Sequence, residues 1–398
     1  MLVHWIWFAA LQGISLRQKL QLLERFSDPE ELYYTDTERV TPALPAEIAQ
    51  ALSDKDLEYA RQIIRNCGDL HIHILTYGDS AYPEQLRNIH NPPLVLYYAG
   101  ALPDFGAQPV IGVVGTRKAS VYGKMNALDM SREIATCGGL VISGGAAGID
   151  TEALKGAMDA GASVVAVLGC GVDVVFPASN RALFQKIKDN GCLISEYPPG
   201  TAPLPWQFPE RNRIISGLSN GVLVIEAPAK SGALITAREA MEQGRDVFVV
   251  PGNINVSTCA GSNSLLQDGA SAVFCGWDVL RDYAFLYKNV KQRKFNQKRS
   301  DNRELSWVSD TVKLPVADKK SVDNSEYYAY SDQSSGAAGT EPLCQKLLDC
   351  LSTEPVPVDH VIARVQEPAA EVLSALTKLA LSGMVINHPG RLVSVKQK

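Results

Sequence analysis

The hydrophobic pattern is most regular between about residues 110 and 283, where short apolar runs alternate with helical patterns. The runs are continuous rather than alternating, which is typical of parallel strands that helices cover on both faces. The pattern therefore predicts a doubly wound, Rossmann-like α/β sheet. Its strands are expected at 110–114, 140–143, 163–168, 192–195, 221–225, 246–250 and 271–274.

The first 70 residues have a helical pattern instead. Apolar residues recur at helical spacing from Leu16 to Phe26, and a further helix is expected at 54–66. The turn at Gln12–Ser15 lies between two helices and could be a DNA-binding hairpin, but the scarcity of basic residues nearby favours a purely structural turn. Residues 1–70 are therefore predicted to form a small helical domain.

Residues 71–109 lead into the sheet. Strands are expected at 71–76 and 94–98, and Pro92-Pro93 predicts a rigid entry into the second of them. We therefore place the boundaries of the α/β domain at residues 71 and 287.

The C-terminal part divides into a polar stretch and a second ordered domain. Residues 288–340 have few apolar positions and no period, which predicts a disordered linker, and its first sixteen residues hold seven basic side chains and one acidic one. Residues 341–398 predict three helices followed by a β-hairpin, the pattern of a winged helix. Six acidic and six basic residues balance in this domain, which favours protein contact or weak DNA binding there.

Composition narrows the class of protein. The chain has 398 residues, a formal net charge of −5 and no apolar run of 18 residues, so neither a general polyanion binder nor a membrane protein is expected. Eight cysteines without a CxxC pair indicate buried thiols in a reducing cytoplasm. The apolar start, residues 1–13, is expected to be a buried helix.

Catalytic signatures are absent from the predicted sheet. None of the six histidines lies between residues 110 and 280, and the chain has no zinc pattern, no GxSxG elbow and no GxxxxGK[ST] loop. The dinucleotide pattern GxGxxG does not follow the first strand. We therefore expect no cofactor, no metal and no catalysis, although a pair of carboxylates would still permit acid–base chemistry.

Phosphate chemistry is instead predicted at the carboxyl ends of the strands. The first strand ends at Gly115-Thr116-Arg117-Lys118, where free backbone N–H groups, a helix start and two full charges favour an anion. Glycine turns have a backbone explanation when taken singly. Residues 110–280 contain 13 basic and 15 acidic residues, yet five basic residues gather at this one edge, which indicates a phosphate-lined pocket. They are Arg117, Lys118, Arg211, Arg213 and Lys230.

Acidic and aromatic residues are expected at the same edge. Asp150 is predicted to cap a helix, and Glu226 to orient Arg211 or Arg213 and leave the other arginine free for phosphate. Phe208, beside the arginines, could stack an unpaired base, although packing against its own helix explains it about as well. Trp206 and Phe176 are further aromatic candidates.

At these residues the chain resembles a known family. The runs GTRKAS, SGGAAGID, VLGCGVDVVFP, NGCLISEYPPGT, FPERNRIISGLS and SGALITA are similar, in order and spacing, to those of the bacterial DNA-processing protein A family, also called Smf. The resemblance covers the whole α/β domain. The flanks agree with the family layout of a sterile-alpha-motif-like N-terminal domain and a C-terminal winged helix.

The resemblance implies a function. Proteins of this family bind single-stranded DNA in a positive pocket, form homodimers through the Rossmann-like domain and load the recombinase RecA during natural transformation. Carried over to this chain, the family motifs make Arg117, Arg211 and Arg213 DNA contacts, with Lys230 a weaker candidate. The complete set of expected DNA-binding positions is Gly115, Thr116, Arg117, Lys118, Ser143, Gly144, Gly145, Phe208, Arg211, Asn212, Arg213, Lys230, Ser231 and Gly232.

The chain departs from the family pattern at two positions. Ala147 stands where members often have arginine, and Lys155 where they often have histidine. The charge missing at Ala147 puts the role of that loop in question, and Lys155 is expected to compensate in part.

The alternative function is that of a nucleotide-processing enzyme. The related lysine-decarboxylase-like fold includes phosphoribohydrolases with a PGGxGTxxE motif. Here the corresponding strand end reads SGALITARE and lacks the double glycine. The sequence therefore favours a non-catalytic binder of single-stranded DNA over such an enzyme.

Overall fold

A computed structural model describes residues 1–35, 45–293, 342–352, 356–365, 367–382, 384–388 and 392–395. The chain divides between Glu304 and Leu305 into two compact units, which are described separately. Most of the expected linker, residues 294–340, lies outside the described residues.

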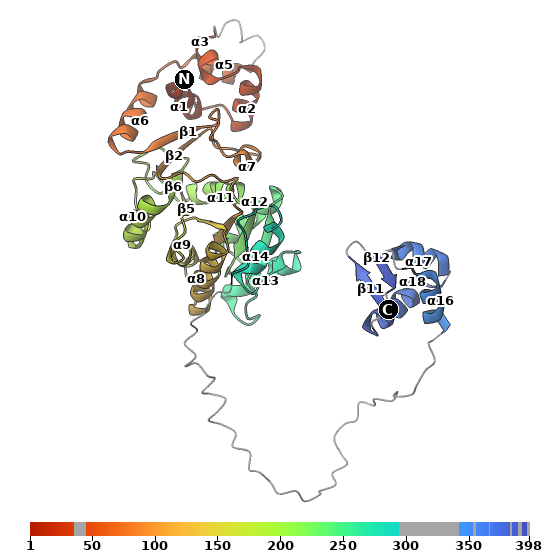
Figure 1. Ribbon diagram of the computed structural model, residues 1–398. Helices are drawn as coiled ribbons and strands as arrows, with labels where there is room; N and C mark the ends of the chain where they lie inside the picture. Colours follow the sequence, from red (N-terminus) through yellow and green to blue (C-terminus); the bar gives the residue numbers. More distant parts are fainter. Residues whose placement is uncertain are drawn as a thin grey trace, which may run out of the picture. The chain divides into compact units, whose positions relative to one another are not determined.

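The N-terminal helices pack around the first of them. Trp5, Ile6, Trp7 and Phe8 on α1 are all buried. The turn before α2 has a structural explanation, because Ser15 forms a reciprocal capping box with Gln18. The helices are α1 (Leu2–Ala10), α2 (Leu16–Arg25), α3 (Pro29–Tyr34), α5 (Ala46–Ser53) and α6 (Glu58–Asp69), and they lie beyond one edge of the β-sheet (Figure 1).

The same unit contains the predicted sheet. Seven strands, β3 to β9, pair in parallel, whereas β1 and β2 extend the sheet in antiparallel fashion beyond β6. The order across the sheet is β1-β2-β6-β5-β4-β3-β7-β8-β9. The strands are β1 (His73–Thr76), β2 (Val95–Gly100), β3 (Val110–Val114), β4 (Leu140–Ser143), β5 (Val164–Leu168), β6 (Cys192–Ser195), β7 (Gly221–Val224), β8 (Asp246–Val249) and β9 (Ser271–Ala272).

This order creates a switch point beside β3. The chain builds outward from β3 through β4, β5 and β6, and then returns to the opposite side of β3 as β7. Loops that follow β3 and β7 therefore diverge to opposite faces of the sheet, and a crevice opens between them. The doubly wound fold expected from the sequence is confirmed, and it puts the candidate site at this crevice.

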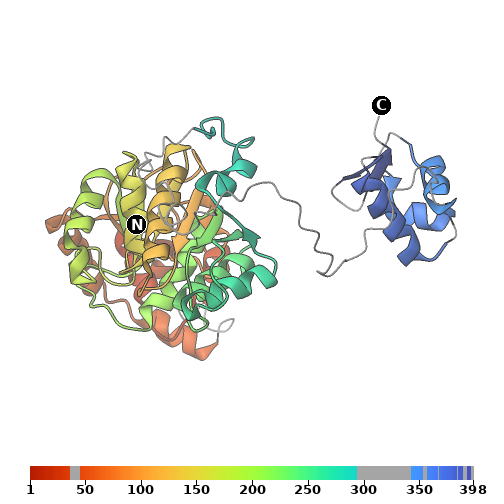
Figure 2. The same ribbon diagram turned by 90° about the horizontal axis from the view of Figure 1, so that it is seen from below.

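Helices cover both faces of the sheet (Figure 2). Alternate residues of β3 enter different apolar clusters, Ile111 and Val113 one and Val110 and Val114 the other. On the first face lie α8 (Val121–Thr136), α9 (Ile149–Asp159), α10 (Arg181–Asn190) and α14 (Gly276–Leu280). On the second lie α7 (Glu84–Arg87), α11 (Gln207–Leu218), α12 (Gly232–Glu242) and α13 (Ala260–Gln267). Short 3₁₀ turns occur at Ala178–Asn180, Ser257–Cys259 and Arg281–Tyr283.

The chain stays packed against this domain past residue 287, where the linker was expected to begin. Val290 is buried in the apolar cluster of the first face, and the N–H of Lys291 donates to the carbonyl of Cys137. None of the eight cysteines forms a disulfide, and all except Cys275 and Cys350 are buried. Within the described ranges, no helix is both long and apolar enough to span a bilayer.

The second unit has the expected winged-helix pattern. Buried residues of its three helices and of the hairpin, among them Leu347, Val372 and Val393, form one core. A two-residue strand not expected from the sequence, β10, precedes the second helix and gives the sheet order β10-β12-β11. The elements are α16 (Pro342–Cys350), β10 (Val356–Pro357), α17 (Val358–Val365), α18 (Ala369–Leu381), β11 (Val385–His388) and β12 (Leu392–Val395).

The packing around α1 generates a stability prediction. Phe8→Ala removes a fully buried ring from among the N-terminal helices and is expected to lower the unfolding free energy by about 3–5 kcal/mol. Leu2→Ala on the same helix removes a side chain that is 38% exposed, and its effect should stay within about 0.5 kcal/mol. Urea unfolding of both variants measures the difference, and equal effects would contradict the packing described for α1.

Candidate nucleic-acid interface

A cavity of about 370 Å³ lies at the switch point of the sheet. Its walls are the turn after β3, the turn after β4, the start of α11 and the turn between β7 and α12. These are the carboxyl ends of neighbouring parallel strands, the place where doubly wound folds bind ligands. Nine of the fourteen expected binding positions line it: Gly115, Thr116, Arg117, Phe208, Arg211, Asn212, Lys230, Ser231 and Gly232.

The turn after β3 is held from two sides. The N–H of Thr116 donates to the carbonyl of Glu226 at 2.8 Å, and its carbonyl accepts from the N–H of Ile149 at 3.3 Å. A Cβ on Gly115 would lie 2.5 Å from the Ile149 side chain, so only glycine permits this approach. The exposed Arg117 and Lys118 therefore extend from a turn that β7 and α9 hold in place, and of the two only Arg117 lines the cavity.

Arg117 lies over an aromatic ring. Its guanidinium carbon is 5.0 Å from the ring centre of Phe208, and the rings of Phe208 and Phe176 are 5.5 Å apart. Both rings also line a smaller adjoining cavity of about 90 Å³, which Gly144 and Ala147 border as well. Phe208 is thus a cavity wall that a cation covers, which supports the stacking interpretation over simple packing on its own helix.

Arg211 lies beneath the cavity rather than at its mouth. Its residue is only 4% exposed, and its Nη1 donates to the carbonyl of Val167 at 2.6 Å. The guanidinium packs so closely on Gly144 that a Cβ there would lie 1.9 Å from Nη1. Burial lowers the pKa of Arg211 to about 10, with Asp150 acting in the opposite direction, so the group is charged at neutral pH.

Asp150 faces this arginine from α9. It is not the helix cap expected from the sequence, because Gly148, with a φ of +86°, occupies that position and Asp150 follows in the first turn. Its carboxylate accepts from the N–H of Ala146 at 3.3 Å. Burial raises the pKa of Asp150 to about 6, against the opposing effects of Arg211 and of backbone N–H groups. The cavity therefore contains a carboxyl group that titrates just below neutrality.

The expectation for Glu226 was wrong. Its side chain is fully buried and contacts neither arginine, because one carboxylate oxygen accepts from both the N–H (3.0 Å) and the hydroxyl (2.9 Å) of Ser120, which caps α8. Glu226 follows β7, which pairs directly with β3, so the residues leading from β3 into α8 lie next to it. No feature of the sequence indicated this contact between residues 106 positions apart.

Arg213 does not join the other basic residues. Two positions on a helix are about 200° apart, so Arg211 and Arg213 leave α11 on nearly opposite sides. Nη2 of Arg213 contacts both carboxylate oxygens of Glu196 at 2.8 Å, and the residue lines a different cavity. The expectation that Arg213 gathers with Arg117 in one phosphate-lined pocket is therefore not met, and Glu196 takes the orienting role that was expected of Glu226.

The remaining expected positions mostly support the site. Asn212 donates to the carbonyl of Gly232 at 3.3 Å and so ties α11 to the first turn of α12, a helix that Ser231 caps. Lys230 is exposed at the cavity. Ser143 is buried and donates to the carbonyl of Val113 at 2.6 Å, and the buried Gly145 has a φ of +65°. These last two shape the turn after β4 without lining either cavity.

Comparison with known proteins identifies the family. A family model described as DNA recombination-mediator protein A matches residues 73–284, which is more than half of the chain. This chain belongs to the DNA recombination-mediator protein A family. A second family model, the DprA winged helix domain, matches residues 331–391. The predicted resemblance is thereby confirmed.

Relatives within the family cover most of the chain. Protein Smf of Synechocystis is 34% identical over 79% of this chain and 78% of its own length. DNA processing protein DprA of Streptococcus pneumoniae is 42% identical over 52% of this chain and 73% of its own length. The X-ray structure of the pneumococcal protein matches this chain with a TM-score of 0.63. The match covers 71% of this chain and 98% of the pneumococcal chain.

The structure shows where the two residues that depart from the family pattern lie. Ala147 borders the smaller cavity, so the missing charge would have been at the site. Lys155 lies two turns along α9, pairs with Glu152 at 3.0 Å and lines neither cavity. The expected compensation by Lys155 is therefore wrong, because its side chain is directed to a neighbour on its own helix.

The contact between Arg211 and Gly144 can be tested by adding one methyl group. Gly144→Ala forces Arg211 to move and is expected to lower the unfolding free energy by about 1–3 kcal/mol. Gly232→Ala, at the larger of the two adjoining cavities, meets no atom within 4 Å and serves as the matched control. Thermal unfolding of the full chain measures the stability of both variants. If Gly144→Ala is as stable as wild type, the position described for Arg211 is wrong.

Proposed function

We propose that this protein binds single-stranded DNA in the switch-point cavity. The observation that carries the proposal is the position of Arg117 over Phe208 at a cavity that Lys230 also lines. A cation beside a partly exposed ring can hold a phosphate and an unpaired base at once, which is how proteins bind single strands without reading sequence. The buried charge of Arg211 raises the positive potential without itself touching the strand.

Single strands fit this site better than duplex DNA. Bases in a duplex are stacked on one another and cannot reach the face of Phe208, whereas an unpaired base can. The formal net charge of −5 also limits long-range attraction for a duplex, so binding depends on local contacts. Salt-dependent titrations with single strands, duplexes and mononucleotides test this choice directly.

We further propose that binding occurs without catalysis. An acid–base mechanism of the phosphoribohydrolase type needs carboxylates that reach the substrate, whereas Glu226 is fully buried and Glu239 lines a different cavity. Asp150 lines the switch-point cavity but is only 6% exposed, and its carboxylate accepts from the N–H of Ala146. Among the described residues, no three His, Cys, Asp or Glu side chains form a group that could hold a metal ion. Release of free base or ribose 5-phosphate from mononucleotides by the purified protein would overturn this proposal.

The cellular role that we propose is recombination mediation during natural transformation. A homodimer formed through the α/β domain would present two cavities to one strand, and the second would gain from high effective concentration. Such a dimer holds the strand open while RecA engages it. Faster RecA filament formation on strands coated by the protein would support this role, and unchanged or slower formation would contradict it.

The proposed DNA contact at Arg117 is tested by Arg117→Ala. Losing one phosphate contact should weaken binding similarly for different sequences and reduce the salt slope by about 0.7 log units. Lys155→Ala removes an equal charge that is paired on α9 outside the cavity, and it should leave the slope unchanged. Fluorescence anisotropy at several salt concentrations measures both variants, and identical behaviour of the two would disprove the assignment.

The pKa of Asp150 predicts that the binding of single-stranded DNA depends on pH. At pH 7.5 this carboxyl group is mostly ionised and offsets the positive cavity, whereas at pH 5.5 it is mostly protonated. Binding of a single strand should therefore tighten as the pH falls, by about tenfold if the coupling amounts to one pKa unit. The Asp150→Asn variant should bind single strands tightly at both pH values. If this variant keeps the wild-type pH profile, groups other than Asp150 cause the pH dependence of binding.

A further inference from the structure

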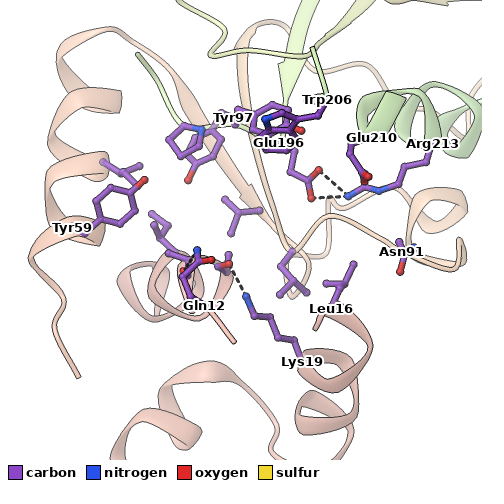
Figure 3. Close-up of a pocket in the computed structure, with 18 residues that line it drawn as sticks. Gln12, Leu16, Lys19, Tyr59, Asn91, Tyr97, Glu196, Trp206, Glu210 and Arg213 are labelled. Carbon is purple, nitrogen blue, oxygen red and sulfur yellow. Dashed lines mark hydrogen bonds and ion pairs between the residues drawn. The ribbon is translucent and has the colours of Figure 1, made fainter. Parts of the chain in front are cut away.

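A second and larger cavity, of about 750 Å³, lies between the helical domain and the sheet in the same compact unit. Helices α1, α2 and α6 form one wall, β2 forms the floor, and the loop after β6 and the start of α11 form the other wall (Figure 3). This volume falls in the range of small-ligand sites, which commonly lie at domain interfaces.

The cavity contains a carboxylate held in a fixed position. Arg213 binds both oxygens of Glu196, yet a carboxylate has about four acceptor sites, so the pair leaves acceptor capacity on Glu196. The side chain of Arg213 is 10% exposed, and its Nη1 has no hydrogen-bond partner among the described residues. An ion pair of this kind can accept hydrogen bonds from the N–H groups of a ligand.

Aromatic rings lie next to this ion pair. Tyr197 and Trp206 pack edge to face with ring centres 6.1 Å apart, and Trp206 is 58% exposed. Tyr59 reaches the cavity from the opposite wall (Figure 3). Large rings that stay exposed around a cavity favour a flat partner, because stacking covers their faces.

The charges of the cavity do not favour phosphate. Nζ of Lys19 donates to the carbonyls of Ala9 (2.8 Å) and Leu11 (2.9 Å) and so satisfies the end of α1. Burial lowers the pKa of Lys19 to about 8, against the opposing effect of Glu196. Because Lys19 is bonded to the end of α1 and Arg213 is paired with Glu196, the charges that a ligand can reach are those of Glu196 and Glu210. The ligand that fits is flat, uncharged and rich in N–H donors.

We propose that this interdomain cavity receives an unstacked nucleobase carrying an exocyclic amine, with Glu196 accepting from the amine and Trp206 stacking on the base. The proposal rests on the proposed function, because the base would belong to the strand held at the switch-point cavity. Pro205 and Phe208 line that cavity and Trp206 lines this one, so a strand that crosses the start of α11 meets both. Carboxylates accept from the amine of cytosine, whereas thymine has no such amine.

The experiment compares oligo(dC) and oligo(dT) of equal length, labelled at one end, in anisotropy titrations at pH 7.5 with the full chain. Wild type should bind oligo(dC) more tightly. Trp206→Ala should weaken binding of both by about fivefold or more, the effect of losing one stacked base. Glu196→Gln should remove the preference for oligo(dC). Phe285→Ala, which truncates an 81% exposed ring that borders neither cavity, should match wild type.

The outcomes separate this inference from the proposed function. If neither oligonucleotide binds wild type, the proposed function fails and the inference falls with it. If Arg117→Ala weakens binding but Trp206→Ala and Glu196→Gln behave as wild type, the function stands and the inference is overturned. Should free deoxycytidine quench Trp206 fluorescence while both variants keep wild-type affinity for oligonucleotides, the cavity takes free nucleosides and the strand proposal is wrong. Because Trp206 is exposed, its truncation tests the inference even if Glu196→Gln destabilises the fold.

Discussion

A positive charge buried at the switch point of the sheet organises the candidate site. Arg211 donates to a carbonyl of β5, faces Asp150 on α9 and packs on Gly144 after β4. Burying a guanidinium is unfavourable unless its charge and its N–H groups meet partners, so the elements around it have little freedom to move. The turn after β4 bears glycine, the first turn of α9 bears an acid, and α11 begins close to β5.

This constraint divides the basic residues of the site into two roles. Arg211 sets the potential of the cavity from beneath, whereas Arg117 and Lys230 are exposed where a strand can reach them. Asp150 limits that potential and makes it sensitive to pH. The departure at Ala147 removes a possible third exposed charge, so the proposed binding relies more heavily on the ring of Phe208 and on Arg117.

The sequence predicted the architecture well because continuous apolar runs and glycine turns reflect local requirements. Every parallel strand was expected within a few residues of its observed place, and the edge that carries the cavity followed from the topology. The hydrogen-bond and ion-pair partners of individual side chains could not be predicted in this way. Whether Glu226 meets Ser120 or an arginine depends on which strands are neighbours, and β3 and β7 are separated by three intervening strands in the chain. The separation of Arg211 from Arg213 was accessible from helical phase alone and was missed.

The interdomain cavity was invisible in the sequence for a related reason. Its walls come from the N-terminal helices, β2, the loop after β6 and the start of α11, which show no shared motif. Lys19, Tyr59 and Glu196 line one cavity because the N-terminal helices pack against β2. Among its lining residues, Trp206 and Arg213 were expected from the sequence to act at the other cavity.

The turn that carries Arg117 has a consequence for the thermodynamics of any ligand that it binds. Both ends of the turn are fastened to Glu226, through the backbone at Thr116 and through the side chain at Ser120, and the N–H of Ile149 also donates to the carbonyl of Thr116. Its conformational entropy is therefore lost when the protein folds and not when a ligand arrives. A preorganised turn of this kind lets each contact contribute more fully to affinity, because little further ordering accompanies binding.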